Sequence, residues 1–328
     1  MAGVTHSDLG YGAINSLLTT TLANFKKQIE DQIFDVYPLL SWLNGKLGIA
    51  IRGKTVKRVL SGGESIVEHL LFEQNSTVDS YAGAEVIDTT LQEGHTIARF
   101  NWKQYAGTVG ITGLERRSNM GEAQLINLLN AKAEQLAMSM RDRMSIDAWA
   151  SSEGNGGKNL TPMGLIVDST GAVGGLNPTT YGWWAATETT SGSFASQGLD
   201  DMRTTFNTVS WGNDKPDIIF TEQTPFEFYE KALQPQERFT SNKVADAGFL
   251  NLTFKGVPIV FDRDCSSSEM YFLNSKYVSF CVHKDADMTQ TPFVQPENQD
   301  VTTSKTIWQG NITTGNRRRL AKMTSIAA

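Results

Sequence analysis

Acidic residues gather at two places in the C-terminal part of the sequence and are of the type needed for acid–base chemistry. Asp262, Asp264 and Glu269 form one group, and Asp285 with Asp287 forms the other. Two carboxylates can serve as general acid and general base when a fold brings them into one cleft. Carboxylates in surface turns are far commoner, so we interpret both groups as solvated turn charges.

The segment Gly154–Lys158, GNGGK, is similar to a phosphate-binding loop but lacks its defining positions. Ser152 stands where that loop has its first glycine, and Asn159 stands where it has the serine or threonine that binds magnesium. The segment also follows an expected helix, whereas a phosphate-binding loop follows a strand. We therefore interpret it as a flexible hinge.

Neither the histidines nor the cysteines have the spacing of a metal site. The four histidines are far apart and form no H-x-x-H or H-E-x-x-H pattern, and the sequence has only two cysteines. Nucleophile-elbow and dinucleotide-binding glycine patterns are also absent from the sequence. We predict no catalytic residue, no metal site and no cofactor. The positions concerned are His6, His69, His95, His283, Cys265 and Cys281.

The composition is that of a globular protein without a strong positive field. Hydrophobic residues make up 40% of the 328 positions, which is enough for a core, and the formal net charge is -6. Any contact with nucleic acid or an anionic membrane must therefore be local. The N-terminus does not have the pattern of a signal peptide, and no apolar run is long enough to span a membrane. We expect maturation in the cytoplasm, with reduced, structural cysteines.

A long polar stretch separates two strand-like segments in the first third of the chain. His69–Phe72 and Ile97–Trp102 have the composition to pair as a hairpin, but the residues between them offer few apolar side chains. Compact domains rarely keep such a stretch without a function. We predict that the stretch finds its contacts elsewhere than in a core of its own.

Helical spacing of apolar residues occurs at two places before residue 150. Ser16–Tyr37 has the pattern of an amphipathic helix, which Pro38 helps to end. Glu122–Trp149 predicts a longer helix, uninterrupted by glycine or proline, with Leu129 and Leu136 on its apolar face. At about 1.5 Å per residue, such a helix is long enough to cross a whole domain.

A composition shift at Ser151–Asn159 marks a domain boundary, and strands and helices alternate after it as in an α/β or α+β protein. We expect short strands and turns over Leu160–Gly175, and a strand pair with a tight turn or bulge over Lys305–Ile326. Between them, the spacing predicts helices over Leu199–Val209 and from the N-cap Thr224, and strands over Pro216–Thr221, Val257–Phe261, Met270–Leu273 and Tyr277–Val282.

Three consecutive arginines, Arg317, Arg318 and Arg319, are the only concentrated positive feature of the sequence. On a strand, alternation would place Arg317 and Arg319 on one face and Arg318 on the other. We interpret the three as residues that form ion pairs between subunits, with local contact to nucleic acid as the alternative.

The order of these elements, together with two stretches of sequence, resembles the major capsid proteins of tailed bacteriophages of the Hong Kong 97 type. The stretches are WKQYAGTVGITGLE at Trp102–Glu115, and FKGVPIVFDRD followed by MYFLNSKYVSF within Phe254–Phe280. The resemblance covers essentially the whole chain. It implies an α+β fold of the Hong Kong 97 type, with an N-terminal arm, an extended β-hairpin loop, a long spine helix, a peripheral domain and an axial domain.

This resemblance also implies boundaries and a function. The arm would cover residues 1–51, the loop 52–114, the peripheral domain 115–159 and 295–328, and the axial domain 160–294. The chain would be a structural protein, not an enzyme, that self-assembles as pentamers and hexamers into an icosahedral shell around double-stranded DNA. The loop would lie across a neighbouring subunit. Candidate intersubunit contacts are Gln74, Asp79, Tyr81, Glu93, Arg317, Arg318 and Arg319.

Partners and location follow from the same resemblance. We expect a separate scaffolding protein, a portal, a decoration protein where one exists, and packaged double-stranded DNA held by weak local contacts, but no membrane. The shell would be part of the virion, after assembly in the host bacterial cytoplasm. Some members cross-link subunits through a loop lysine, but Glu73–Ile97 contains none, which leaves Lys54, Lys57 and Lys103 near its base. We therefore expect a non-covalent shell.

Two other interpretations stay open at the level of sequence. An encapsulin-type shell has a similar fold but encloses a cargo enzyme instead of a genome. The second is an α/β enzyme with its site among Asp262, Asp264 and Glu269, because a fold alone does not fix a function.

Overall fold

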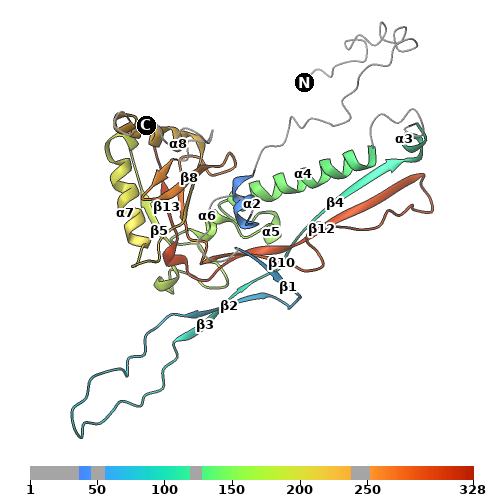
Figure 1. The fold of residues 1–328 in the computed structure, drawn as a ribbon. Helices are drawn as coiled ribbons and strands as arrows, with labels where there is room; N and C mark the ends of the chain where they lie inside the picture. Colours follow the sequence, from blue (N-terminus) through green and yellow to red (C-terminus); the bar gives the residue numbers. More distant parts are fainter. Residues whose placement is uncertain (1–36, 46–55, 119–127, 238–251) are drawn as a thin grey trace.

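The structure is a computed structural model of the 328-residue chain, and it describes residues 37–45, 56–118, 128–237 and 252–328. The molecule is elongated: a body carries a long arm on one side and a thin loop on the other (Figure 1). The predicted N-terminal arm and its helix lie outside the described residues, apart from 37–45. Within the described ranges, no helix is both long and apolar enough to cross a bilayer.

A five-stranded sheet joins the arm to the body. It contains β1 (Lys57–Leu60), β10 (Val278–His283), β12 (Val301–Thr314) and β11 (Thr289–Gln290) in that order, with β4 (Lys103–Thr112) also paired to β12. This long arm is not the predicted N-terminal arm. It consists of β4 and β12, which pair antiparallel from Lys103 opposite Gly310 to Thr112 opposite Val301. At the body end, Trp308 is buried and stacks on Phe280 with ring centroids 5.5 Å apart.

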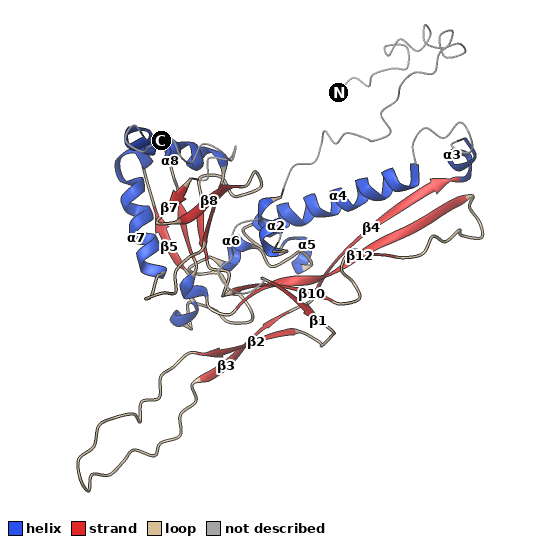
Figure 2. Ribbon diagram, viewed as in Figure 1, coloured by secondary structure: helices blue, strands red, loops and turns tan. Residues whose placement is uncertain are grey.

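The long helix α4 (Leu128–Trp149) runs beside the arm and ends in the body (Figure 2). Met140, Met144 and Ala148 are buried on one side of it, which agrees with the predicted apolar stripe. Leu136 packs against the same core, and a Cβ on Gly107 of β4 would overlap its side chain. The glycine therefore allows helix and strand to approach closely. The side chain of Leu129 lies outside what the structure describes.

We expect Met144→Asp to prevent stable folding. The side chain is 2% exposed, so the change removes roughly 2–5 kcal/mol of burial and leaves an unpaired carboxylate in the core. Ser139→Asp is the matched control, because Ser139 is exposed on the same helix. Soluble yield and cooperative thermal unfolding provide the measurement. A Met144→Asp chain as stable as Ser139→Asp would show that the buried face is assigned wrongly.

A six-stranded sheet forms the other part of the body. Its order is β5 (Thr187–Thr190), β13 (Ala321–Thr324), β9 (Met270–Leu273), β6 (Ile218–Thr221), β8 (Val257–Phe261) and β7 (Thr253–Phe254). Helices α7 (Leu199–Val209) and α8 (Gln223–Glu237) lie on this sheet (Figure 1). Met202 and Phe206 of α7 share a core with Phe272 and Met323 of the sheet.

The shorter elements connect these parts. They are α2 (Pro38–Leu43), α3 (Gly113–Ser118), α5 (Gly154–Gly157), α6 (Met163–Ile166), the 3₁₀ helices η2 (Gly182–Trp184) and η5 (Arg317–Arg319), and the π-helical turn η3 (Phe194–Gly198). The remaining strands, β2 (Ile66–Leu71) and β3 (His95–Phe100), form a two-stranded hairpin in which His69 lies opposite Ile97. The predicted hairpin is therefore confirmed.

Several expectations for the second half of the chain are wrong. Residues 305–326 do not form a strand pair, because β12 belongs to the five-stranded sheet and β13 to the six-stranded one. The segment predicted as strands over Leu160–Gly175 contains α6 and one isolated bridge, Val173 to Leu176. Thr224 is inside the first turn of α8 and is not its N-cap.

Both cysteines are buried and unbridged, as predicted. Burial raises the pKa of the Cys265 and Cys281 thiols. Because the thiolate is the reactive form, these side chains act as small apolar groups of the core.

Candidate subunit interface

The residues between β2 and β3, 72–94, extend away from the body as an irregular loop (Figure 2). Its backbone is shaped by short-range side-chain bonds. Asp79 accepts from the Ser80 N–H at 2.8 Å, and Asp88 accepts from the Thr90 N–H at 2.9 Å. Such turns form locally and need no packing. Hydrogen bonds from Thr90 hold the pKa of Asp88 below its usual value.

Apolar side chains on this loop are exposed to an unusual degree. Val86 is 98% exposed and Leu91 94% exposed. Together these side chains give one short segment an apolar area that is available to another protein. The group, which we call the apolar set of the loop, is Val78, Tyr81, Val86, Ile87 and Leu91. Apart from Tyr81, its members were not predicted as contacts, because they stand singly in a polar sequence without any period.

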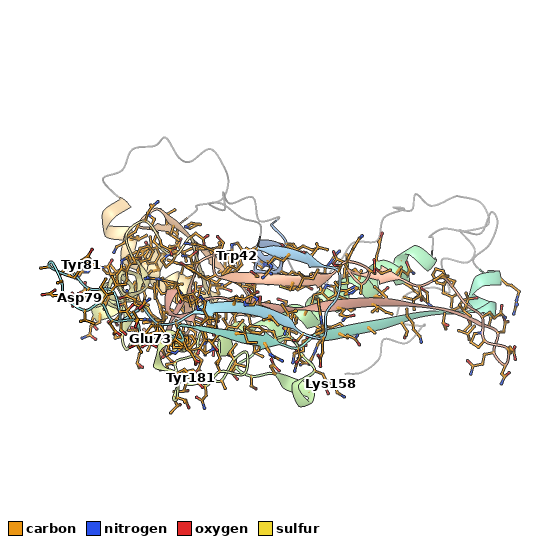
Figure 3. All side chains as sticks on the ribbon, turned by 90° about the horizontal axis from the view of Figure 1, so that it is seen from below. Trp42, Glu73, Asp79, Tyr81, Lys158 and Tyr181 are labelled. Carbon is orange, nitrogen blue, oxygen red and sulfur yellow. The ribbon has the colours of Figure 1, made fainter. Side chains whose placement is uncertain are left out.

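The four predicted loop contacts are all exposed along the same segment. Gln74 and Glu93 are close in sequence to its two ends. Asp79 and Tyr81 lie towards its tip, away from the body residue Trp42 (Figure 3). The loop carries negative charge only, since no lysine or arginine occurs within 72–94. Its carboxylates are Glu73, Asp79, Glu85, Asp88 and Glu93. An acidic, partly apolar segment therefore extends from the subunit.

The base of the loop is fixed to the body. Phe72 stacks on Trp183 with ring centroids 5.2 Å apart, and the Arg99 N–H donates to the Gly174 carbonyl at 2.9 Å. Gly174 has a φ of +64°, and a Cβ there would lie 2.8 Å from the Cβ of Ala98. Glycine is required at this position on both grounds. The loop thus extends from a fixed base.

Arg317 corrects the prediction made for the arginine run. The three residues form η5 and not a strand, and the Arg317 side chain is 0% exposed. A fully buried side chain is not available for an ion pair with another subunit, so that expectation is wrong for Arg317.

The Arg317 guanidinium binds backbone carbonyls inside its own subunit. Its Nε donates to Ile166 at 2.8 Å and its Nη1 to Gly171 at 2.9 Å, while Nη2 donates to Leu165 at 3.0 Å and Asp168 at 2.6 Å. Burial lowers the pKa of Arg317 to about 10, which leaves it charged at neutral pH. Arg317 therefore holds the end of α6 and the segment after it against η5.

Arg318 and Arg319 differ from Arg317. Arg318 is exposed, and the Arg319 guanidinium lies over the Trp211 ring at 5.1 Å from its centroid. Trp211 is 73% exposed, on a turn closed by paired backbone bonds with Asp214 at 2.8 and 3.0 Å. We call Trp211, Arg318 and Arg319 the Trp–Arg surface.

The first carboxylate group makes contacts inside the subunit. Asp262 is buried and accepts from the Leu39 N–H at 3.0 Å, in the first turn of α2, and burial raises its pKa. Asp264 accepts from the Ser145 hydroxyl at 2.5 Å, and Glu269 accepts from the Tyr271 hydroxyl. These bonds join α2, α4 and β9 to the turn after β8.

Asp287 of the second acidic pair and the glycine-rich segment are also held within the chain. Asp287 pairs with Lys57 at 2.6 Å. Lys103, only 5% exposed, pairs with Glu153 at 2.6 Å and donates to the Gly157 carbonyl. The segment predicted as a flexible hinge is therefore fixed by a buried lysine. Among the described residues, no group of three or more histidine, cysteine or acidic side chains has the arrangement of a metal site.

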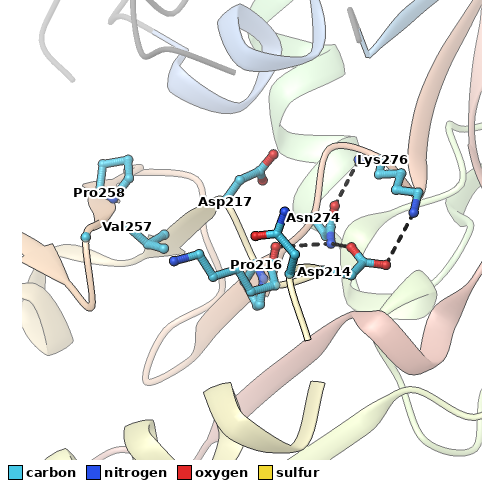
Figure 4. Close-up of a pocket in the computed structure, with 10 residues that line it drawn as sticks. Asp214, Pro216, Asp217, Val257, Pro258, Asn274 and Lys276 are labelled. Atoms are coloured by element: carbon cyan, nitrogen blue, oxygen red, sulfur yellow. Dashed lines mark hydrogen bonds and ion pairs between the residues drawn. The ribbon is translucent and has the colours of Figure 1, made fainter. Parts of the chain in front are cut away.

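A cavity of about 380 Å³ lies beside β6 and β8 (Figure 4). Its polar lining groups bind one another: Asp214 accepts from Asn274 Nδ2 at 2.8 Å and pairs with Lys276 at 3.4 Å. Asp217 accepts from the Ser275 N–H at 3.1 Å, and burial raises the pKa of its carboxyl. Asp214, Asp217, Asn274 and Lys276 of the lining thus already have partners within the chain.

Comparison with known proteins gives similarity of structure only. No protein-family model matches the chain, and no curated protein matches its sequence. The capsid of cyanophage A-1(L) superposes with a TM-score of 0.64 at 14% identity, covering 95% of this chain and 99% of the other. The capsid of Myoviridae phage XM1 gives a TM-score of 0.62 at 11% identity, covering 99% and 100%. The SrpI encapsulin of Synechococcus elongatus PCC 7942 gives 0.62 at 9% identity, covering 95% of each chain.

These similarities extend over nearly the whole chain and confirm the predicted mixed helix-and-sheet fold of the capsid type. At such low identity the likeness concerns the fold alone. The encapsulin matches as well as one of the phage capsids does. Fold similarity therefore does not choose between a shell for a genome and a shell for an enzyme.

Proposed function

We propose that this chain is the major capsid protein of a tailed bacteriophage, which self-assembles into an icosahedral shell around double-stranded DNA. The loop 72–94 is the observation that carries the proposal. It exposes Val86 and Leu91 almost completely, and it extends from a fixed base away from the body. A soluble monomer gains nothing from such a loop, whereas a subunit that places it on a neighbour buries it.

The rest of the subunit suits a structural role. The carboxylates that might have formed a catalytic group, Asp262, Asp264 and Glu269, bind groups that join separate elements of the body. The fold that this chain shares with the phage capsids supports the proposal. We propose pentamers and hexamers as the repeating units, because closed shells are built from rings of one chain.

The proposed surroundings follow the same logic. A net charge of -6 suits a wall that contains DNA without binding it strongly, so contacts with the genome would be weak and local. A separate scaffolding protein, a portal and, where present, a decoration protein complete the assembly. The chain would be made and assembled in the host bacterial cytoplasm and end in the virion, without a membrane.

Electron microscopy of the purified chain tests the proposal. We express the chain alone and together with a scaffolding partner, and we expect closed icosahedral particles. Absence of particles under both conditions would contradict the proposed function. Particles isolated from infected host cells should protect double-stranded DNA from nuclease. A co-purifying enzyme in place of DNA would favour the encapsulin-type shell, for which the SrpI similarity is the supporting observation.

Shells of this protein should come apart into single chains without chemical cleavage. No lysine lies within Glu73–Ile97, so the loop has no amine for an isopeptide bond. Boiled shells are expected to run on a denaturing gel as one band near 36.1 kDa. A ladder of covalent multimers would contradict this expectation, and shells from a Lys57→Arg chain would then show whether that lysine is the source.

A further inference from the structure

The chemistry of the loop restricts what it can bind. Five carboxylates and no cation lie within 72–94, together with the apolar set. Charged groups across an interface are arranged with complementary sign, and like charges placed opposite one another cost several kcal/mol. The surface that receives this loop must therefore be basic and must also offer apolar area.

Several cations of the described residues are already paired with a carboxylate of their own chain. Arg117 pairs with Asp300 at 2.8 Å and Arg203 with Asp200 at 2.8 Å, for example. Pairs of this kind also hold Lys57, Arg58, Lys132, Arg143 and Lys276. These cations have little charge left to offer to a neighbour.

The Trp–Arg surface differs from these pairs. Within the described ranges, neither Arg318 nor Arg319 forms an ion pair, and the two are adjacent. Arg319 lies over the Trp211 ring, and Trp211 exposes 73% of its surface. Tryptophan and arginine are the residues most enriched among those that dominate binding energy at protein interfaces.

This surface is also held in place before anything binds. The buried Arg317 fixes η5 through its four carbonyl contacts, and the Asn316 side chain accepts from the Arg318 N–H at 3.1 Å. Trp211 sits on a turn with Gly212 at a φ of +58°, closed by bonds to Asp214. A surface that is already ordered loses less entropy on binding.

We propose that the acidic loop of one subunit docks on the Trp–Arg surface of a second copy of this chain. This inference rests on the proposed shell function and names the receiving surface for the loop. The loop carboxylates would bind the guanidinium groups of Arg318 and Arg319, and the apolar set would cover the exposed face of Trp211. A second copy is the occupant because both complementary surfaces belong to this one chain.

Charge exchange tests the docking. One variant carries Asp79→Lys with Glu85→Lys, another carries Arg318→Glu with Arg319→Glu, and a third combines all four. Each double variant should reduce the yield of closed shells by about tenfold or more, since 1.4 kcal/mol per contact is already tenfold. The combined variant should recover most of that yield. Microscopy and sedimentation provide the readout, and thermal unfolding checks that each chain folds.

The control is Lys158→Glu with Lys231→Glu, two exposed lysines elsewhere on the chain. It changes the net charge by the same amount as Arg318→Glu with Arg319→Glu. This control should assemble normally. A combined variant no better than the doubles, or normal shells from either double, would overturn the docking. Normal empty shells from the arginine double that fail to retain DNA would assign the surface to nucleic acid instead. Absence of shells from the unaltered chain would overturn the proposed function, and the docking with it.

Cysteine pairing decides the matter if a charge-exchanged chain does not fold. Ser80 and Asn213 are exposed, one at the loop tip and one beside Trp211. Shells of the Ser80→Cys, Asn213→Cys chain should give disulfide-linked multimers on mild oxidation, whereas the single variants should give none. The native Cys265 and Cys281 are buried and take no part. If intact shells of the double variant give single-chain bands and no multimers after oxidation, the docking is overturned.

Discussion

A chain in which Gln74–Glu93 is replaced by a short Gly-Ser turn is expected to fold as a soluble subunit and to form no closed shells. Residues 74–93 are almost all exposed and contribute no side chain to either buried core. Their removal therefore costs the subunit little stability. Thermal unfolding should stay cooperative, with a midpoint close to that of the parent.

Assembly should fail for a different reason. The missing contact recurs at every subunit of a closed symmetric shell, so a small loss at each contact is multiplied over the particle. The control keeps the length of the segment but replaces residues 74–93 by twenty glycine and serine residues. It should also fail, because the side chains and not the span make the contact. A shortened chain that does not fold would place the loop in the subunit core. A shortened chain that still forms closed shells would show that the loop is not part of the subunit interface.

Local sequence patterns were sufficient to predict the bounds of an element where its own apolar residues follow a regular spacing. Helix α7 begins and ends at the predicted residues, Leu199 and Val209, because Met202 and Phe206 are buried at helical spacing. The strands β8 and β9 also have the predicted bounds. In each of these cases a short apolar segment packs against the sheet or within it.

Pairing between distant segments was not predictable in this way. Strands β12 and β13 are separated only by residues 315–320, yet they belong to different sheets. The short connection and alternating pattern favoured a strand pair. Leu320 and Arg317 are both fully buried in this connection, so the core redirects the chain there. Such burial depends on residues more than a hundred positions away, and the local sequence carries no sign of it.

The candidate interface was predicted by its polarity and missed in its apolar part. Tyr81 and Asp79 were expected on an outward loop, and both lie at its tip. Val86 and Leu91 were not among the predicted contacts, because each stands singly in a polar stretch. Their significance comes from exposure, which a single sequence does not report.

The arginine run also shows that a single sequence does not report burial. Three adjacent arginines have the composition of a solvated surface, and Arg318 is exposed while Arg319 is half-buried over the Trp211 ring. Arg317 is buried because the end of α6 and the chain after it turn four carbonyls towards one point, and a guanidinium has five N–H donors in a fixed plane. One residue therefore completes the body, and its neighbours remain available to a partner.

Replacing Arg317 by methionine is expected to destabilise the subunit by about 3 kcal/mol or more, because buried carbonyls lose their donors. Methionine fills part of the volume but donates no hydrogen bond, so the carbonyls of Leu165, Ile166, Asp168 and Gly171 lose this donor. Arg317→Lys should recover only part of the loss, since an ammonium has three donors and no planar fork. Urea unfolding of purified subunits measures both changes.

Arg318→Met is the matched control, because it removes the same side chain from the adjacent, exposed position. Its effect on the free energy of unfolding should stay within about 0.5 kcal/mol, as for most surface substitutions. Both variants should give few shells, but for different reasons. Arg318→Met leaves a stable subunit that assembles poorly, whereas the Arg317→Met subunit is too unstable to reach assembly. Equal losses of stability for the two variants would contradict the division of roles, since they would mean that the four carbonyl bonds contribute no more than a surface charge.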